Sequence, residues 1–192
     1  MTLLWLVGLA GLAAIYAALV TVCILGLGRL LRQMEIWRAA PLLWVTFFFV
    51  FLTQHPFPDL QTLDCPVPSA TPQLKLFRFW DTVAVLREQD RTLIGWLGNR
   101  TIAATLMNFL ICLFIGLALS RHVRRFLIAM LFGATLSLTV ELTQLTGIWG
   151  LYPCAYRQFN VDDLFMNVLG IIAGFVIGRG ILTRKLLPYP EG

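Results

Sequence analysis

The chain has 192 residues, of which 58% are hydrophobic and 13% are charged, and its mean hydropathy is +0.79. This composition is too apolar for a soluble domain and predicts an integral membrane protein. The formal net charge of +5 would suit a nucleic-acid-binding protein, but the basic residues lie at the ends of apolar runs, so membrane topology explains them and no nucleic-acid partner is expected.

Five apolar runs are predicted to cross the membrane as helices. Residues 3–28 carry no charge and lack the basic start and short apolar core of a signal peptide, so they are expected to remain as the first span. The second run, residues 39–53, is short and needs its flanking residues to cross a bilayer. The spans predict an all-α, polytopic protein with one domain over residues 1–192 and its core at 101–182. The other predicted spans are residues 101–119, 126–146 and 164–182.

Residues 54–100 form the largest segment between predicted spans. Proline, aspartate and threonine make residues 54–75 a loop by composition. Leu76, Trp80 and Val83 then recur at helical spacing. This spacing predicts either an amphipathic helix on the membrane surface or a packed connector.

Basic residues cluster at alternate connections between the predicted spans. Because positively charged connections stay in the cytoplasm, the clusters place the C-terminus in the cytoplasm and the N-terminus outside. Residues 54–100 and 147–163 are then extracytoplasmic. The clusters are Arg29, Arg32 and Arg38; Arg121, Arg124 and Arg125; and Arg179, Arg184 and Lys185.

Polar side chains interrupt the last three runs near their predicted extracytoplasmic ends. Glu141 and Gln144 share one helix face in the fourth run. Asp163 and Asn167 share one face at the start of the fifth run, and Asn108 lies at a similar depth in the third. Because ionisable groups inside a membrane are costly, their shared depth predicts a functional pocket open to the outer leaflet.

Glu141 and Asp163 are the candidate catalytic residues of this pocket, acting as acid and base. Arg157 is the cation expected to balance them, and its alternative role is an ion pair that only fixes its loop. A buried polar clamp is the alternative role for Glu141 with Gln144, and stabilisation of its own helix start is the alternative for Asp162. The candidate substrate-binding residues are Arg157, Asn167, Gln144, Asn108 and Asp162.

Two of the four cysteines lie outside the predicted spans. Cys65 and Cys154 both fall on the extracytoplasmic side, where disulfides persist, so a bridge between them is predicted, with bridges to partner chains as the alternative. Cys23 and Cys112 lie within spans and are expected to be free thiols. No zinc-site spacing is present, so no cofactor is expected. The carboxylates leave a divalent cation as the alternative.

Three glycines follow Asn167 along the same helix face. Gly170, Gly174 and Gly178 are spaced four residues apart, which lets membrane helices approach closely. This face is therefore predicted to pack against the third or fourth span. The packing would bring the acidic start of the fifth span towards Glu141.

Two stretches of the chain resemble the VanZ-like membrane proteins. They are SLTVELTQ at residues 137–144 and YRQFNVDDLFMNVLGIIAG at residues 156–174. Asn108 resembles part of a further family segment, without that segment's proline, and Asn160 stands where many relatives have aspartate, so it is placed outside the site. The resemblance implies a bacterial cytoplasmic membrane protein of the cell envelope, linked to resistance to the glycopeptide teicoplanin. The matching residues are Ser137, Glu141, Gln144, Arg157, Asp162, Asp163, Asn167, Gly170 and Gly174.

Three functions fit these residues. The first is an envelope protein that binds or modifies a lipid-linked or headgroup substrate at the outer leaflet, with a membrane lipid or lipid-linked envelope precursor as its partner. The second is a non-catalytic transporter of a lipid or polyprenyl carrier, and the third is a membrane scaffold. The sequence leaves open which of the three applies, and it leaves the oligomeric state open.

Overall fold

The computed structural model describes residues 3–61, 63, 65, 71–89, 92, 95–96 and 98–186. Within these residues the secondary structure is helical, apart from one isolated bridge between Gln73 and Asn160. The helices are α1 (Leu3–Leu30), η1 (Met34–Ala39), α2 (Ala40–Gln54), α3 (Phe79–Glu88), α5 (Arg100–Leu119), α6 (Phe126–Leu145), α7 (Gly147–Gly150) and α8 (Val161–Leu186).

Five of the helical segments are long and apolar enough to cross a membrane, which confirms the predicted all-α, five-span architecture. The short second run gains length from the 3₁₀ helix η1, so that the span covers Glu35–Gln54. Pro41 lies in the first turn of α2, where its missing N–H costs little. The fifth span begins at Val161, three residues earlier than predicted. The chain is therefore a multi-pass membrane protein.

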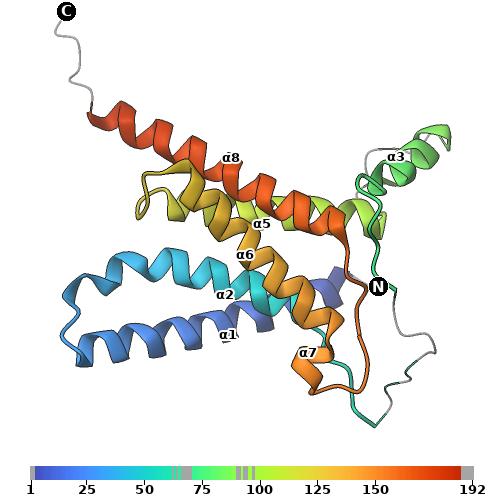
Figure 1. Ribbon diagram of the computed structural model, residues 1–192, viewed down its shortest axis with the longest axis horizontal. Coiled ribbons are helices and arrows are strands. Elements are labelled where there is room, and N and C mark those ends of the chain that lie inside the picture. Colours follow the sequence, from blue (N-terminus) through green and yellow to red (C-terminus); the bar gives the residue numbers. More distant parts are fainter. Residues whose placement is uncertain are drawn as a thin grey trace, which may run out of the picture.

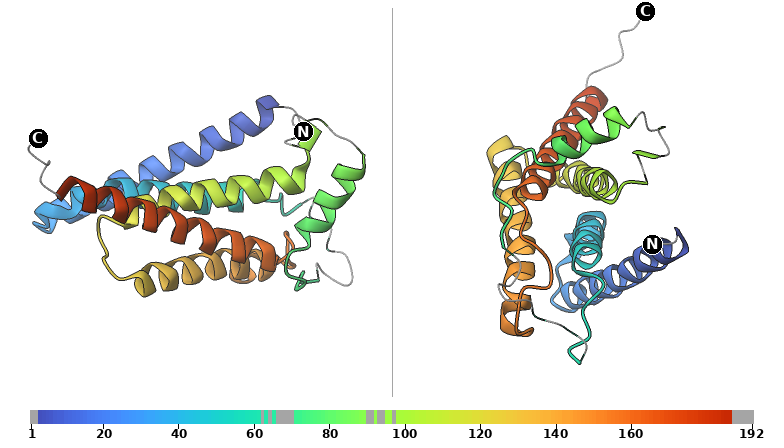
Figure 2. Two further views of the ribbon diagram at one scale, coloured as in Figure 1. Left: turned by 90° about the horizontal axis from the view of Figure 1, so that it is seen from above. Right: turned by 90° about the vertical axis from the view of Figure 1, so that its right-hand side faces the viewer.

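The spans form a bundle in which α8 packs against α5 and α6, while α2 packs against α5 (Figure 1). The helix α1 lies at the edge of the bundle beside α2 (Figure 2). Apolar side chains from four helices meet in the centre. This core contains Val45 and Phe49 of α2, Ile111, Cys112, Ile115 and Leu119 of α5, Ala129 and Val140 of α6, and Ile171 and Phe175 of α8.

The two ends of the bundle differ in the residues they carry. The α1–α2 and α5–α6 connections and the end of α8 lie at one end, called the basic end because the arginines of the two connections lie there (Figure 1). The helix α3 and the turn α7 lie at the other end, called the loop end below. The side chains of Arg184 and Lys185 lie outside the described part. The grouping agrees with the predicted topology, and the assignment of the basic end to the cytoplasm stays a prediction.

The glycine face of α8 packs directly on the backbone of α5. A Cβ atom added at Gly174 would meet the carbonyl oxygen of Leu113, and one added at Gly170 would meet that of Phe109. The partner is therefore the third span rather than the fourth. The backbones of these two helices therefore approach closely along this face, next to the apolar side chains that both helices contribute to the core.

We expect Gly174→Ala to destabilise the bundle. The new methyl group would overlap the α5 backbone, and overpacking of this kind costs about 1–3 kcal/mol. Gly180→Ala is the matched control, because a Cβ at Gly180 on the same helix would have no atom within 4 Å. Thermal unfolding of both variants in detergent should show a lower midpoint only for Gly174→Ala. Equal midpoints would contradict the close α5–α8 contact.

The segment whose spacing predicted an amphipathic helix or a packed connector contains the helix α3. The helix α3 covers Phe79–Glu88, buries Leu86 and leaves Trp80 and Val85 exposed. Asn99 caps α5, since its side-chain oxygen accepts hydrogen bonds from the backbone N–H groups of Thr101 and Ile102. A position of α3 on the membrane surface stays a prediction.

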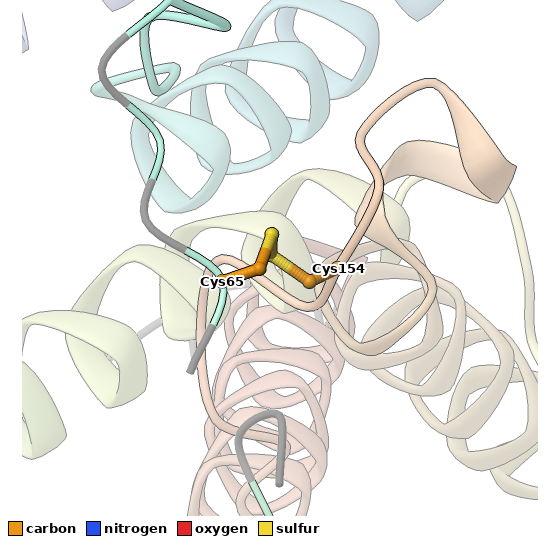
Figure 3. The surroundings of a disulfide bond; sticks show 2 residues. All are labelled: Cys65 and Cys154. Atoms are coloured by element: carbon orange, nitrogen blue, oxygen red, sulfur yellow. A yellow bond between two sulfur atoms is a disulfide. The ribbon is translucent and has the colours of Figure 1, made fainter. Parts of the chain in front are cut away.

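The predicted disulfide is confirmed, because Cys65 and Cys154 are bonded with their Cα atoms 5.9 Å apart (Figure 3). The bridge joins the segment after α2 to the loop between α7 and α8, two segments separated by 89 residues in sequence. Cys23 and Cys112 are free thiols, as predicted. The bridge thus ties the two long connections of the loop end together.

Candidate functional site

Two carboxylates from different helices lie close together at the loop end. Glu141 of α6 is 3% exposed, and its Oε2 accepts a hydrogen bond of 2.8 Å from the backbone N–H of Asn160. Asp163, in the first turn of α8, accepts a hydrogen bond of 3.2 Å from the side-chain amide of Asn108 on α5. The two acids lie near enough to repel each other electrostatically. Three helices therefore meet at a pair of acidic groups.

Arg157 supplies positive charge beside this pair. Its guanidinium is near enough to attract both Glu141 and Asp163. The predicted ion pair is not formed, because the only ion pairs among the described residues involve other side chains. Arg157 instead donates a hydrogen bond of 2.6 Å to the carbonyl oxygen of His55, directly after α2. One N–H is thus used to fix the side chain, and a guanidinium has five.

Asn160 lies at the centre of the site, although the resemblance to VanZ-like proteins placed it outside. Its side-chain oxygen accepts a hydrogen bond of 3.0 Å from the Asp162 N–H, which makes Asn160 the N-cap of α8. The same oxygen accepts a hydrogen bond from the side chain of Gln73. An asparagine directly before an apolar helical run is a capping signal that would have identified it.

Asp162 faces a different element from Asp163. Both of its carboxylate oxygens accept backbone hydrogen bonds, one from Phe77 and one of 3.0 Å from Phe79. It therefore satisfies N–H groups at the start of α3. It also lies in the first turn of α8, where its negative charge is favourable, as the alternative role for Asp162 predicted. The structure does not bring Asp162 into the Glu141–Asp163 pair by hydrogen bonding, and its role is to hold α3 on α8.

We expect Asp162→Ala to loosen α3. The substitution leaves the Phe77 and Phe79 N–H groups without their acceptor, and losing a helix cap costs about 0.5–2 kcal/mol. Tryptic cleavage after the exposed Arg78, which lies between these two residues, should become faster. Glu88→Ala, at the opposite end of α3, should leave the cleavage rate unchanged. Equal cleavage of both variants would show that Asp162 does not anchor the helix.

Gln144 and Asn167 are buried clamps between helices. The side-chain amide of Gln144 donates a hydrogen bond of 2.8 Å to the carbonyl oxygen of Thr53 at the end of α2. The Asn167 amide donates one of 2.9 Å to the Ser137 hydroxyl, and its oxygen accepts a contact from the Cys112 thiol. Both side chains thus have partners within the bundle. The Gln144 contact is therefore the polar clamp that was the alternative role for this residue, and it joins α6 to α2.

Gln54 and Tyr156 form a further contact of the loop end that the sequence did not indicate. The Tyr156 hydroxyl donates to the side-chain oxygen of Gln54, whose amide donates a hydrogen bond of 3.4 Å to the Val140 carbonyl. Burial raises the pKa of Tyr156 to about 12. The phenol therefore stays protonated at neutral pH and holds the loop beside Arg157 in place.

The described residues line hollows at both ends of the bundle. A groove of about 370 Å³ at the loop end is lined by Tyr16, Leu19, Val20, Phe51, His55 and Phe57. A hollow of about 610 Å³ lies at the basic end, beside Arg38 and Arg121, and includes none of the predicted site residues. No group of three or more His, Cys, Asp or Glu side chains in the described ranges is arranged to hold a metal ion.

The sequence model of the VanZ/LLP1 family matches residues 39–183. The match covers more than half of the chain and includes every predicted site residue and both bridged cysteines. No curated protein and no solved structure matches the chain.

Proposed function

Because the chain belongs to the VanZ/LLP1 family, which is linked to teicoplanin resistance, we propose that it binds the headgroup of an anionic lipid or lipid-linked precursor at the cell envelope. The observation that carries this proposal is the arrangement of Arg157 beside the Glu141–Asp163 pair at the loop end. Charged groups placed together in a membrane domain are costly and mark functional sites.

Arg157 is the group that would hold an anion. It is exposed, it is fixed by the His55 carbonyl, and it forms no ion pair with the described residues. A guanidinium with unused N–H donors suits the oxygens of a phosphate. Its charge also offsets the repulsion between the two carboxylates and an approaching anion.

The carboxylates would recognise a different part of the headgroup. Carboxylate oxygens accept hydrogen bonds, so Glu141 and Asp163 suit hydroxyl or amino groups next to the phosphate. Asn108 holds Asp163 in position, and the Asn160 N–H holds Glu141. In the same positions, the two acids suit proton transfer to and from such a group.

The positive-inside rule places this site on the extracytoplasmic side of a bacterial cytoplasmic membrane. The arginines of the α1–α2 and α5–α6 connections would lie in the cytoplasm, and the disulfide at the loop end would lie in an oxidising compartment. Both features support the same orientation.

The proposal is tested by comparing Arg157→Gln with Arg78→Gln in bacteria that express the chain. Arg78 is also exposed and lies at the loop end, but Arg157 is the arginine whose charge acts on Glu141 and Asp163. Arg157→Gln should abolish the change in teicoplanin susceptibility and in envelope lipid composition at unchanged protein abundance. Arg78→Gln should keep both. Altered lipid flux with unchanged lipid composition would favour a transporter, and lower abundance of Arg157→Gln would favour a scaffold.

A further inference from the structure

The groove at the loop end is built by α1, α2 and the residues after α2. Most of its lining is apolar, and Leu19 of α1 is 58% exposed. The ring of His55 lines the groove, stacked on Tyr16 with the ring centroids 5.8 Å apart and tilted against Phe57 with the centroids 4.6 Å apart. Tyr16, Leu19 and Val20 lie within the first span and Phe51 lies within the second, so the groove is at a depth that lipid chains occupy.

His55 has a buried nitrogen without a partner. Its Nε2 makes no hydrogen bond with any described residue. Buried polar groups are nearly always satisfied, and leaving one unpaired is unfavourable. Water is a poor candidate for this nitrogen, since a buried water needs two to four polar partners and the surrounding rings and aliphatic side chains offer few.

The same residue also contacts the headgroup site. The backbone carbonyl of His55 accepts the hydrogen bond from Arg157, while its ring lines the groove. His55 therefore lies between the cation beside the carboxylates and the apolar groove. An amphiphile could bind with its anionic head at Arg157 and its hydrocarbon chain along Leu19. The polar atoms that join its head to its chain would then lie at His55.

We propose that the groove holds the hydrocarbon chain of an anionic lipid, and that His55 Nε2 hydrogen-bonds the polar junction between its head and its chain. This inference rests on the proposed headgroup site at Arg157, to which it adds the chain and the junction. It identifies the substrate class as a membrane lipid rather than a water-soluble anion. It also makes His55 a positioning residue that the sequence did not single out.

The groove is tested with full-length protein in nanodiscs of phosphatidylcholine, to which dioleoyl phosphatidylglycerol is added as the anionic probe. Leu19→Trp should fill the groove and weaken phosphatidylglycerol binding, measured by native mass spectrometry, by about tenfold, the factor that a difference of about 1.4 kcal/mol produces. Leu27→Trp is the matched control, because Leu27 is also 58% exposed on α1 but does not line the groove. It should leave binding unchanged.

His55→Phe tests the nitrogen separately from the ring. It keeps the aromatic packing and removes the hydrogen bond, so phosphatidylglycerol binding should weaken by about threefold to tenfold.

Binding of glycerol phosphate, a soluble headgroup analogue measured by calorimetry, should be unaffected by Leu19→Trp. An equal effect of Leu19→Trp and Leu27→Trp, or equal retention of phosphatidylcholine and phosphatidylglycerol, would overturn the inference.

Arg157→Gln separates the two proposals. If it weakens binding of both probes while Leu19→Trp weakens neither, the headgroup site stands and the groove does not hold the chain. If Arg157→Gln changes neither probe, the headgroup site fails and the inference drawn from it fails as well. If Leu19→Trp weakens binding of both phosphatidylglycerol and glycerol phosphate, the substitution damages the protein generally. That result would overturn the proposal that the groove holds the hydrocarbon chain of the lipid.

Discussion

Glu141→Gln is expected to abolish the function of the protein while leaving it folded and abundant. The glutamine side chain retains an oxygen that can accept the hydrogen bond from the Asn160 N–H, so the contact between α6 and the start of α8 survives. What is lost is the negative charge and the ability to take up a proton. Teicoplanin susceptibility and envelope lipid composition, each normalised to membrane abundance, should match those of cells without the protein.

One further variant of Glu141 and one control on α3 separate the effect of charge from the effect of structure. Glu141→Ala removes the acceptor and leaves the Asn160 N–H unpaired, which should cost about 1–3 kcal/mol and lower the unfolding midpoint. Glu88→Gln removes one carboxylate charge from the exposed end of α3 and should leave function intact. Full activity of Glu141→Gln would show that Glu141 is a structural acceptor, which is the polar-clamp alternative.

The architecture was predictable because lipid imposes strong rules on sequence. Uncharged or weakly charged runs of about twenty residues identify spans, and the arginine clusters predict which connections share a side. The second span was the weakest prediction, since α2 alone has 15 residues. The missing length comes from η1, whose start at Met34 follows no strong sequence signal.

The site was only partly predictable because helical spacing gives the face of a residue but not its partner. Spacing predicted that Glu141 and Asp163 would share one pocket, and the Asp163 charge acts on Glu141, while the pocket itself stays a prediction. It could not show that His55 would contact Arg157, 102 residues later, or that Gln73 would contact Asn160, 87 residues later. Such contacts depend on how the long connection folds back, which the disulfide and the Gln73–Asn160 bridge determine.

The turn after α6 shows a second limit of sequence reasoning. Gly147 and Gly150 adopt positive φ angles, as glycines often do, but so do Ile148 and Trp149 between them, at 54° and 57°. Bulky and β-branched residues avoid this left-handed region, so propensity argues against such a turn. A Cβ at Gly147 would meet the carbonyl oxygens of Tyr152 and Cys154, so the loop packs back against the turn.

Removal of the Cys65–Cys154 disulfide should give the largest loss of stability among these variants. The bridge closes a loop of 89 residues in sequence separation, for which the chain-entropy argument gives about 4 kcal/mol. This value is an upper bound, because membrane spans stay inserted in the unfolded state and keep the loop ends closer together than in a free chain. We expect Cys154→Ser to lower the thermal midpoint in detergent by about 5–15 °C, using about 2–4 °C per kcal/mol for a chain of this size.

Reductant should produce the same shift in the wild-type protein and none in Cys154→Ser. Cys23→Ser is the matched control, because Cys23 is an exposed free thiol outside the loop end. The loss should also reach the site, since Cys154 lies three residues before Arg157 and the bridge holds that loop against the segment after α2. Phosphatidylglycerol binding should therefore weaken in reductant. Unchanged midpoints with and without reductant would show that the hydrogen bonds of Tyr156 and Asn160 hold the loop end without the bridge.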